Sequence, residues 1–265
     1  MALANHARWA VRNAITSDGK EATSPMEAIR RQRPDAEPHG PDAAAPPVAP
    51  IRHILSTPGS WYRRRGKRAL DVALGGLAFT ALLPVMAAIA LAVLATSGWP
   101  VVYASERVGR DGRPFRMRKF RTMVRDADRL LQAWRELRPD LAAEYGETFK
   151  VRNDPRVTWL GRLLRKTSLD ELPQLWNVLR GEMSLVGPRP VPKHELEDKY
   201  GAMSEHVFSV PPGMTGVWQV NGRSDTDYAE RVRYDADYAA SVSALLDLKI
   251  LLQTLPAVAL RRGAE

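Results

Sequence analysis

Cysteine is absent from the 265-residue chain, and its absence excludes disulfides, thiolate metal sites and cysteine nucleophiles. The five histidines lack metal-ligand spacing, and no glycine-rich loop matches a P-loop or a dinucleotide motif. The first residues lack the apolar core of a signal peptide. Acidic residues are fewer than basic ones, 30 against 39, so the net charge is +9. That surplus indicates an anionic partner: nucleic acid, anionic lipid or a phosphate-rich substrate.

Composition divides the sequence into three parts. Residues 1–62 include six prolines between Pro34 and Pro50, and they hold too few apolar side chains to offset chain entropy. We predict a disordered Pro/Ala-rich tail there. Residues 63–98 contain a basic flank followed by an apolar run, and residues 99–265 have the mixed composition of a folded domain.

The apolar run is the clearest physical feature of the sequence. Residues 72–96 are 25 positions without a charge, and at ~1.5 Å per residue they can cross a ~30 Å hydrocarbon layer. A buried core helix is the alternative. Arginine and lysine lie on both flanks and favour the cytoplasmic side, while Pro84 removes a backbone hydrogen bond at the centre. We expect a re-entrant helix that breaks at Leu83 and Pro84, with a kinked simple span as the other topology.

Shorter patterns predict the remaining elements. Asp111 and Gly112 form a turn dipeptide between two short strands, which predicts a small β-hairpin. Apolar residues at helical spacing predict amphipathic helices, and proline and glycine predict loops from Gly187 to Arg223. The expected fold is therefore mixed α+β and helix-rich. The predicted ranges are strands at 101–105 and 114–120, helices at 124–137, 157–164 and 172–179, and a final helix at about 227–260.

Two adjacent carboxylates, Asp170 and Glu171, are the candidate reactive groups. Carboxylates hold Mg²⁺ together with phosphate oxygens and water, and an aspartate can attack phosphorus to form an acyl-phosphate. A structural reading is equally available, because Ser168 and Glu171 have the spacing of a capping box at a helix start. The two readings are compatible.

Arginine is abundant around this acidic pair. Guanidinium groups bind phosphate oxygens in a bidentate way, although a solvated basic face or contact with lipid headgroups would also account for them. Arg165 and Arg189 are favoured as phosphate ligands, because Pro188 and Pro190 fix the backbone on either side of Arg189.

Several strings, taken in order, resemble one family: the bacterial sugar transferases, also called monotopic phosphoglycosyl transferases. The similarity extends from about Arg64 to Leu260. The strings are Lys119-Phe-Arg-Thr-Met123, Asp154-Pro-Arg-Val-Thr158, Arg165-Lys-Thr-Ser-Leu-Asp-Glu-Leu-Pro-Gln174, Gly187-Pro-Arg-Pro190, Pro212-Gly-Met-Thr-Gly216 and Gln219-Val-Asn-Gly-Arg223.

The resemblance implies a mechanism. Asp170 would attack the β-phosphate of a UDP-sugar and release UMP, and polyprenyl phosphate would then take the phospho-sugar from the enzyme. Glu171 would help hold Mg²⁺ with Asp170. Pro84 would match the family's helix break, although the residue before it is often serine in small members and is leucine here. The phosphate-binding residues would be Arg165, Arg189, Lys119, Arg121 and Arg223.

The resemblance also implies partners and a location. It places the catalytic domain on the cytoplasmic face of the bacterial inner membrane, as a monotopic protein with amphipathic interfacial helices. The expected donor is UDP-galactose or UDP-glucose, the acceptor is undecaprenyl phosphate, and the product starts exopolysaccharide synthesis. A homodimer is a candidate assembly, and no nucleic-acid partner is expected. Two other hypotheses are a nucleic-acid-binding protein, favoured by the charge, and a non-catalytic membrane scaffold.

Overall fold

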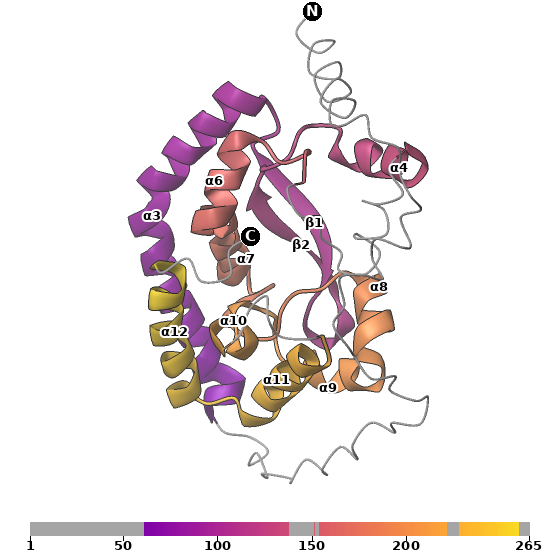
Figure 1. The fold of residues 1–265 in the computed structure, drawn as a ribbon. Coiled ribbons are helices and arrows are strands. Elements are labelled where there is room, and N and C mark those ends of the chain that lie inside the picture. The colour runs from indigo at the N-terminus through magenta and orange to yellow at the C-terminus, as the bar shows by residue number, and fades with distance from the viewer. Residues whose placement is uncertain (1–60, 138–150, 152–153, 222–227, 260–265) are drawn as a thin grey trace, which may run out of the picture. The chain divides into compact units, whose positions relative to one another are not determined.

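The computed structural model describes residues 61–137, 151, 154–221 and 228–259, all within one compact unit, His53–Glu265. The predicted tail up to residue 60 and Arg223 lie outside the described residues. Figure 1 shows the arrangement of the elements. In chain order they are η1 (Tyr62–Gly66), α3 (Lys67–Ser97), β1 (Val102–Val108), η2 (Arg110–Gly112), β2 (Pro114–Phe120), α4 (Ala127–Leu137), α6 (Trp159–Thr167), η3 (Leu169–Glu171), α7 (Gln174–Arg180), β3 (Ser184–Val186), α8 (Lys193–Glu195), η4 (Leu196–Tyr200), η5 (Gly201–Met203), α9 (Ser204–Val207), β4 (Gly213–Thr215), α10 (Val217–Asn221), α11 (Tyr228–Ser241) and α12 (Ala244–Ala259).

The predicted hairpin is confirmed. Strands β1 and β2 pair antiparallel from Val102 opposite Phe120 to Val108 opposite Pro114. Asp111 and Gly112 both have positive φ at the connection, as the Asp-Gly dipeptide indicates. Phe115 and Met117 on β2 face inward and pack against Val178 of α7. The hairpin thus places one face of β2 over the centre of the fold.

Helix α3 is one continuous helix, and Pro84 lies inside it. The expected break at Leu83 and Pro84 is therefore not confirmed. With η1 in front of it, α3 forms the single described helix that is long and apolar enough to cross a membrane, Tyr62–Ser97. Most of its surface is exposed, including Leu77 and Leu91.

Both halves of α3 pack against the same folded unit. In the first half, the Phe79 ring lies 6.0 Å from that of Trp176 on α7. In the second half, Val93 is buried in a cluster with Phe120 and Leu164. Figure 1 shows α6 and α7 beside α3 accordingly. A straight crossing by α3 would therefore draw α6 and α7 into the bilayer with it.

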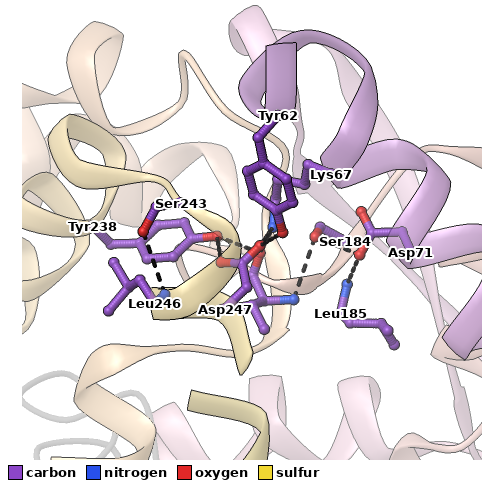
Figure 2. Close-up of polar contacts among 10 residues, drawn as sticks. Tyr62, Lys67, Asp71, Ser184, Leu185, Tyr238, Ser243, Leu246 and Asp247 are labelled. Atoms are coloured by element: carbon purple, nitrogen blue, oxygen red, sulfur yellow. Dashed lines mark hydrogen bonds and ion pairs between the residues drawn. The ribbon is translucent and has the colours of Figure 1, made fainter. Parts of the chain in front are cut away.

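A buried ion pair fastens the start of α3 to the C-terminal helix (Figure 2). Lys67 Nζ donates to Asp247 Oδ2 at 2.6 Å, and both side chains are almost fully buried. Tyr62 Oη donates to the same carboxylate at 2.6 Å, and Tyr238 Oη lies 2.7 Å from its other oxygen. The backbone carbonyl of Val186 accepts from Lys67 Nζ at 2.9 Å. Lys67 therefore balances a buried charge rather than facing lipid headgroups.

A second carboxylate on α3 holds strand β3. Asp71 Oδ1 accepts from Ser184 Oγ and from the Leu185 backbone N–H, both at 2.9 Å (Figure 2). One turn earlier, Arg68 donates to the carbonyls of Val178 and Leu179 near the end of α7. The polar residues at the start of α3 thus serve the fold, although the sequence places them in a basic flank.

Two predictions about the C-terminal half are corrected. The single long final helix is wrong: Ser241 ends α11, and Ser243 begins a new helix by accepting from the Leu246 N–H at 3.3 Å. The predicted loop region from Gly187 onward contains the short helices α8, α9 and α10, with the 3₁₀ and π turns. It also contains β4, which pairs in parallel with β3. Because these elements are three to five residues long, they carry no readable periodicity.

Candidate functional site

The acidic pair sits directly after α6, and close packing at the start of α6 fixes its position. Thr158 caps the helix, since its Oγ accepts from the Gly161 N–H at 3.0 Å, while its own N–H donates to the Thr122 carbonyl. A Cβ on Gly161 would lie 2.0 Å from that carbonyl oxygen, so only glycine permits this approach. The end of β2 and the start of α6 are therefore locked together.

The predicted capping box at Ser168 is wrong. Ser168 adopts the left-handed conformation, with φ 56°, and its backbone N–H closes the end of α6. Its side chain makes no capping hydrogen bond to the short turn η3 that carries Asp170 and Glu171. The reversal at Ser168 instead turns the chain so that Asp170 is directed inward.

Asp170 is buried, with 7% of its surface exposed. Burial raises the pKa of its carboxyl above the ordinary value, the Lys119 and Arg165 charges lower it, and the Glu171 charge raises it. Within the described part of the chain, the Asp170 carboxylate forms no direct ion pair. It is therefore a desolvated carboxylate beside two cations, with its oxygens not held in a salt bridge.

Lys119 links the hairpin to the acidic pair. Its Nζ lies 2.6 Å from Glu171 Oε1, and both side chains are about one-third exposed. The two residues are 52 positions apart, and β2 and η3 are brought together by the packing of Phe120 against Leu169 and Leu172. The structure thus brings Lys119 of β2 next to the Asp170–Glu171 pair of η3.

Arg165 joins the same group from α6. Its Nε donates to Thr122 Oγ1 at 3.0 Å, and burial lowers the pKa of its guanidinium while the nearby Asp170 charge raises it. Behind it, Asp154 and Arg156 form a buried bidentate ion pair with a closest contact of 2.6 Å. Because that pair is internally neutral, Arg165 and Lys119 are the cations that act on Asp170.

Arg121 contacts the end of α3 rather than the acidic pair. Its guanidinium donates to the Ser97 and Gly98 carbonyls at the end of α3, the latter at 2.6 Å. Its Nε and Nη1 are buried without a partner among the described residues. Its contacts are those of a cation at the C-terminus of a helix, where the dipole favours positive charge.

Arg189 belongs to a second group. Its guanidinium carbon lies 5.4 Å from the centre of the Trp218 ring, and its backbone N–H donates to Asp235 at 3.4 Å. Arg231 of α11 also lies over Trp218, at 5.0 Å. None of the contacts described for Arg189 includes Asp170 or Glu171.

Sequence reasoning missed Trp218, Arg231 and Asp235. The spacing of Arg231 and Asp235, four apart on one helix, places them on the same face and was an available signal. Asp235 is buried, and it forms no ion pair with another residue that the structure describes. Desolvation raises its pKa to about 7, and Tyr200 Oη donates to it at 3.1 Å. The Asp235 carboxylate thus helps to fix the backbone of Arg189, whose N–H it accepts.

A divalent cation would find few protein ligands here. Among the described residues, no group of three or more histidine, aspartate and glutamate side chains gathers as a metal site. Asp170 and Glu171 are two adjacent carboxylates on η3, the first buried and the second partly exposed, and Mg²⁺ commonly takes one or two carboxylates plus phosphate oxygens and water. The residues therefore fit a Mg²⁺ that arrives with a phosphate-bearing substrate.

Comparisons with family models and with individual proteins indicate the same family. A model of the bacterial sugar transferase family matches residues 62–261. The exopolysaccharide production protein ExoY of Sinorhizobium fredii is 46% identical over 198 residues, covering 75% of this chain and 87% of the relative.

Two longer relatives carry more specific names. A UDP-galactose-lipid carrier transferase of Erwinia amylovora is 48% identical over 199 residues, covering 75% of this chain and 41% of the relative. A UDP-glucose:undecaprenyl-phosphate glucose-1-phosphate transferase of Escherichia coli is 40% identical over 217 residues, covering 78% and 43%. The chain thus spans less than half the length of these two proteins.

Proposed function

Because the chain belongs to the bacterial sugar transferase family, we propose that it transfers a hexose 1-phosphate from a UDP-sugar to undecaprenyl phosphate. The named relatives act on galactose and glucose derivatives, so UDP-galactose and UDP-glucose are the donors to test first. The observation that carries the proposal is the buried Asp170 carboxyl beside Lys119 and Arg165.

The reaction proceeds in two displacements at one phosphorus atom. An Asp170 carboxylate oxygen attacks the β-phosphorus of the UDP-sugar, and the bond from that phosphorus to the UMP oxygen breaks. UMP leaves with the bonding electron pair, and the phospho-sugar stays on Asp170. An oxygen of undecaprenyl phosphate then attacks the same phosphorus, and the aspartyl–phosphorus bond breaks. The carboxylate is restored, and the lipid diphosphate sugar is the product.

Each charged residue around Asp170 has a role in this scheme. The charges of Lys119 and Arg165 lower the pKa of Asp170 against the effect of its burial and so favour the carboxylate, and they offset the negative charge that the phosphoryl oxygens bring. Glu171 and Asp170 would hold Mg²⁺ against those oxygens, and the bound ion would neutralise charge as UMP departs. Arg165 stays in place because Thr122 accepts from its Nε.

We propose that α3 attaches the enzyme to the inner membrane from the cytoplasmic face. Basic residues flank the apolar run on both sides, and both halves of the continuous helix α3 pack against the catalytic unit, which supports a monotopic arrangement over a plain span. Trp61, Trp99 and Trp159 are exposed at the ends of α3 and at the start of α6. Tryptophan at such positions is typical of a membrane–water interface, which supports α6 as an interfacial helix.

Release of UMP from a panel of UDP-sugars tests the reaction, using the full chain in detergent with Mg²⁺ and undecaprenyl phosphate. We expect release from one sugar, and its loss on addition of EDTA. Asp170→Asn should lower the rate by on the order of 10⁴-fold, because the amide is not a nucleophile. A covalent phospho-sugar should be trapped on the wild type when the acceptor is omitted.

Asp128→Asn is the matched control, since Asp128 is an exposed aspartate on α4. It should release UMP at the wild-type rate. Turnover by Asp170→Asn within tenfold of that of Asp128→Asn would exclude covalent catalysis by Asp170.

A further inference from the structure

The short turn that carries the acidic pair runs directly into α7. Leu172 and Pro173, which join η3 to α7, both have helical backbone angles. Side chains three or four residues apart therefore lie on one face of this helical run. One such face is buried, because the exposed fraction is 7% at Asp170, 2% at Gln174 and 0% at Asn177. Gln174 thus shares the buried face with the proposed nucleophile, one turn away.

This buried face lies against strand β2. Near the middle of α7, Asn177 Oδ1 accepts from the Arg118 N–H at 3.0 Å. On η3, Glu171 accepts from Lys119 Nζ, on the next residue of β2, at 2.6 Å. Gln174 lies between these two connections along the helical run and on the same buried face as Asn177. Its position is therefore beside the group formed by Lys119 and the acidic pair.

The side-chain amide of Gln174 makes no hydrogen bond to any residue that the structure describes, although the residue is almost fully buried. The amide oxygen and nitrogen are not completely enclosed, so they reach solvent through a narrow gap. An amide offers two donor hydrogens and one acceptor oxygen, and leaving them unused in the interior costs stability. Buried polar groups of this kind commonly have a partner that is not part of the chain, either water or a ligand.

We propose that the Gln174 amide binds a hydroxyl group of the hexose, namely the 2-hydroxyl, which lies nearest the transferred phosphate. This inference rests on the proposed function for the identity of the donor. Residues one helical turn apart have Cβ atoms about 5–6 Å apart, so a phospho-sugar bound to Asp170 lies within reach of Gln174. The phosphate matches the cations Lys119 and Arg165. A neutral amide matches a hydroxyl instead, because each group is both a donor and an acceptor.

The contact gives the site a means of distinguishing sugars. A buried polar group that binds a substrate hydroxyl disfavours an analogue without that hydroxyl, because the protein group is then left unpaired. The effect of removing the amide and the effect of removing the hydroxyl should therefore not add, since both changes delete the same hydrogen bond.

Calorimetric titration of the full chain in detergent measures this coupling, with Asp170→Asn in every sample to prevent turnover. The ligands are UDP-galactose, UDP-glucose and the 2-deoxy analogue of each. Gln174→Met should weaken binding of the preferred UDP-hexose by about three- to tenfold, the contribution of one hydrogen bond. Binding of the matching 2-deoxy analogue should not change.

Thermal unfolding of Gln174→Met separates a binding role from a structural one. Methionine has a similar shape and removes an amide that has no partner among the described residues, so the unfolding midpoint should stay the same or rise. A lower midpoint, with both ligands bound as before, would show that the amide serves the fold and would contradict the proposal. Gln174→Leu keeps the test valid if Gln174→Met fails to fold.

Gln132→Met is the matched control, because Gln132 is an exposed glutamine on α4. It should bind all four ligands as the Asp170→Asn chain does. Equal weakening of a UDP-hexose and its 2-deoxy analogue by Gln174→Met, unchanged binding of both, or a chain that binds none of the four would overturn the contact. If Gln174 instead proves to bind a UDP-hexose while the wild type releases no UMP from any UDP-sugar, the proposed function is wrong and the sugar contact stands.

Discussion

At the scale of single residues, the ionisation of Asp170 is the point on which the proposed chemistry depends. Burial disfavours the carboxylate, and Lys119 and Arg165 oppose that effect. A nucleophile needs the ionised form, so activity is lost as pH falls through the pKa of Asp170 in the folded protein. Because that pKa is above the ordinary value, the loss should begin at a higher pH than for an exposed aspartate.

Lys119→Met should move this acid limit to still higher pH. The Lys119 charge lowers the pKa of Asp170, so its removal raises that pKa and protonates the carboxyl earlier on acidification. The measurement is the pH dependence of the first UMP release, without acceptor, in wild type and variant. Arg118→Met is the control, since Arg118 neighbours Lys119 on β2 and pairs with Glu182 instead. An acid limit at the same pH in Lys119→Met and Arg118→Met would show that Lys119 does not act on Asp170.

The identity of the candidate nucleophile could be read from the sequence, while its surroundings could not. The Asp170–Glu171 string identifies the residues, but the contact of Lys119 with Glu171 joins positions 52 apart, which no local pattern encodes. The sequence also did not predict that the contacts of Arg189 are with Trp218 and Asp235 rather than with Asp170. Such facts depend on how β2, η3 and the Pro-rich loop pack, and packing depends on the whole chain.

At the scale of elements, the approach of α6 to the end of β2 sets the position of Arg165. Gly161→Ala would place a methyl group 2.0 Å from the Thr122 carbonyl oxygen, so α6 must move away. We expect a loss of about 1–3 kcal/mol in stability, as for other overpacked sites, and a fall in UMP release. Thermal unfolding and UMP release in detergent measure the two effects.

Gly76→Ala offers a matched comparison within α3. A Cβ there would meet only the end of the Leu179 side chain, at 3.9 Å. Since alanine is also the better helix former, this variant should be neutral or slightly more stable. If Gly161→Ala and Gly76→Ala had the same thermal stability and the same rate of UMP release, α6 could shift without consequence for the site.

Elements with strong local signals were predictable, and those that depend on distant partners were not. The hairpin followed from Asp111 and Gly112, and α6 from its apolar spacing. The parallel pair of β3 and β4 has three residues per strand, and its stability comes from neighbours such as Asp71 on α3. Serine at position 243 was a readable start signal for α12 that the continuous apolar pattern concealed.

At the scale of the whole molecule, the topology of α3 decides where the two substrates meet. Both halves of α3 pack on the catalytic unit, so we expect both of its ends on the cytoplasmic face. Single cysteines at Arg65 and Trp99, two exposed positions, test this with a membrane-impermeant maleimide. The cysteine-free chain gives no background labelling.

The expected result is labelling of both positions in inverted vesicles and of neither in intact cells. Ser241→Cys, exposed at the end of α11, reports the face on which the catalytic unit lies. Labelling of Arg65→Cys and Trp99→Cys from opposite faces would establish a simple span and exclude the monotopic arrangement.

The buried pair of Lys67 and Asp247 has a consequence for attempts to obtain a water-soluble enzyme. A chain shortened to begin at residue 99 would leave the Asp247 carboxylate in the interior without its cation, and Asp71 would no longer hold β3. Phe120 and Leu164, which pack against Val93 of α3, would also become exposed to water. Deleting the hydrophobic helix therefore removes part of the core, and detergents or lipid nanodiscs that retain it are the productive route to pure, active protein.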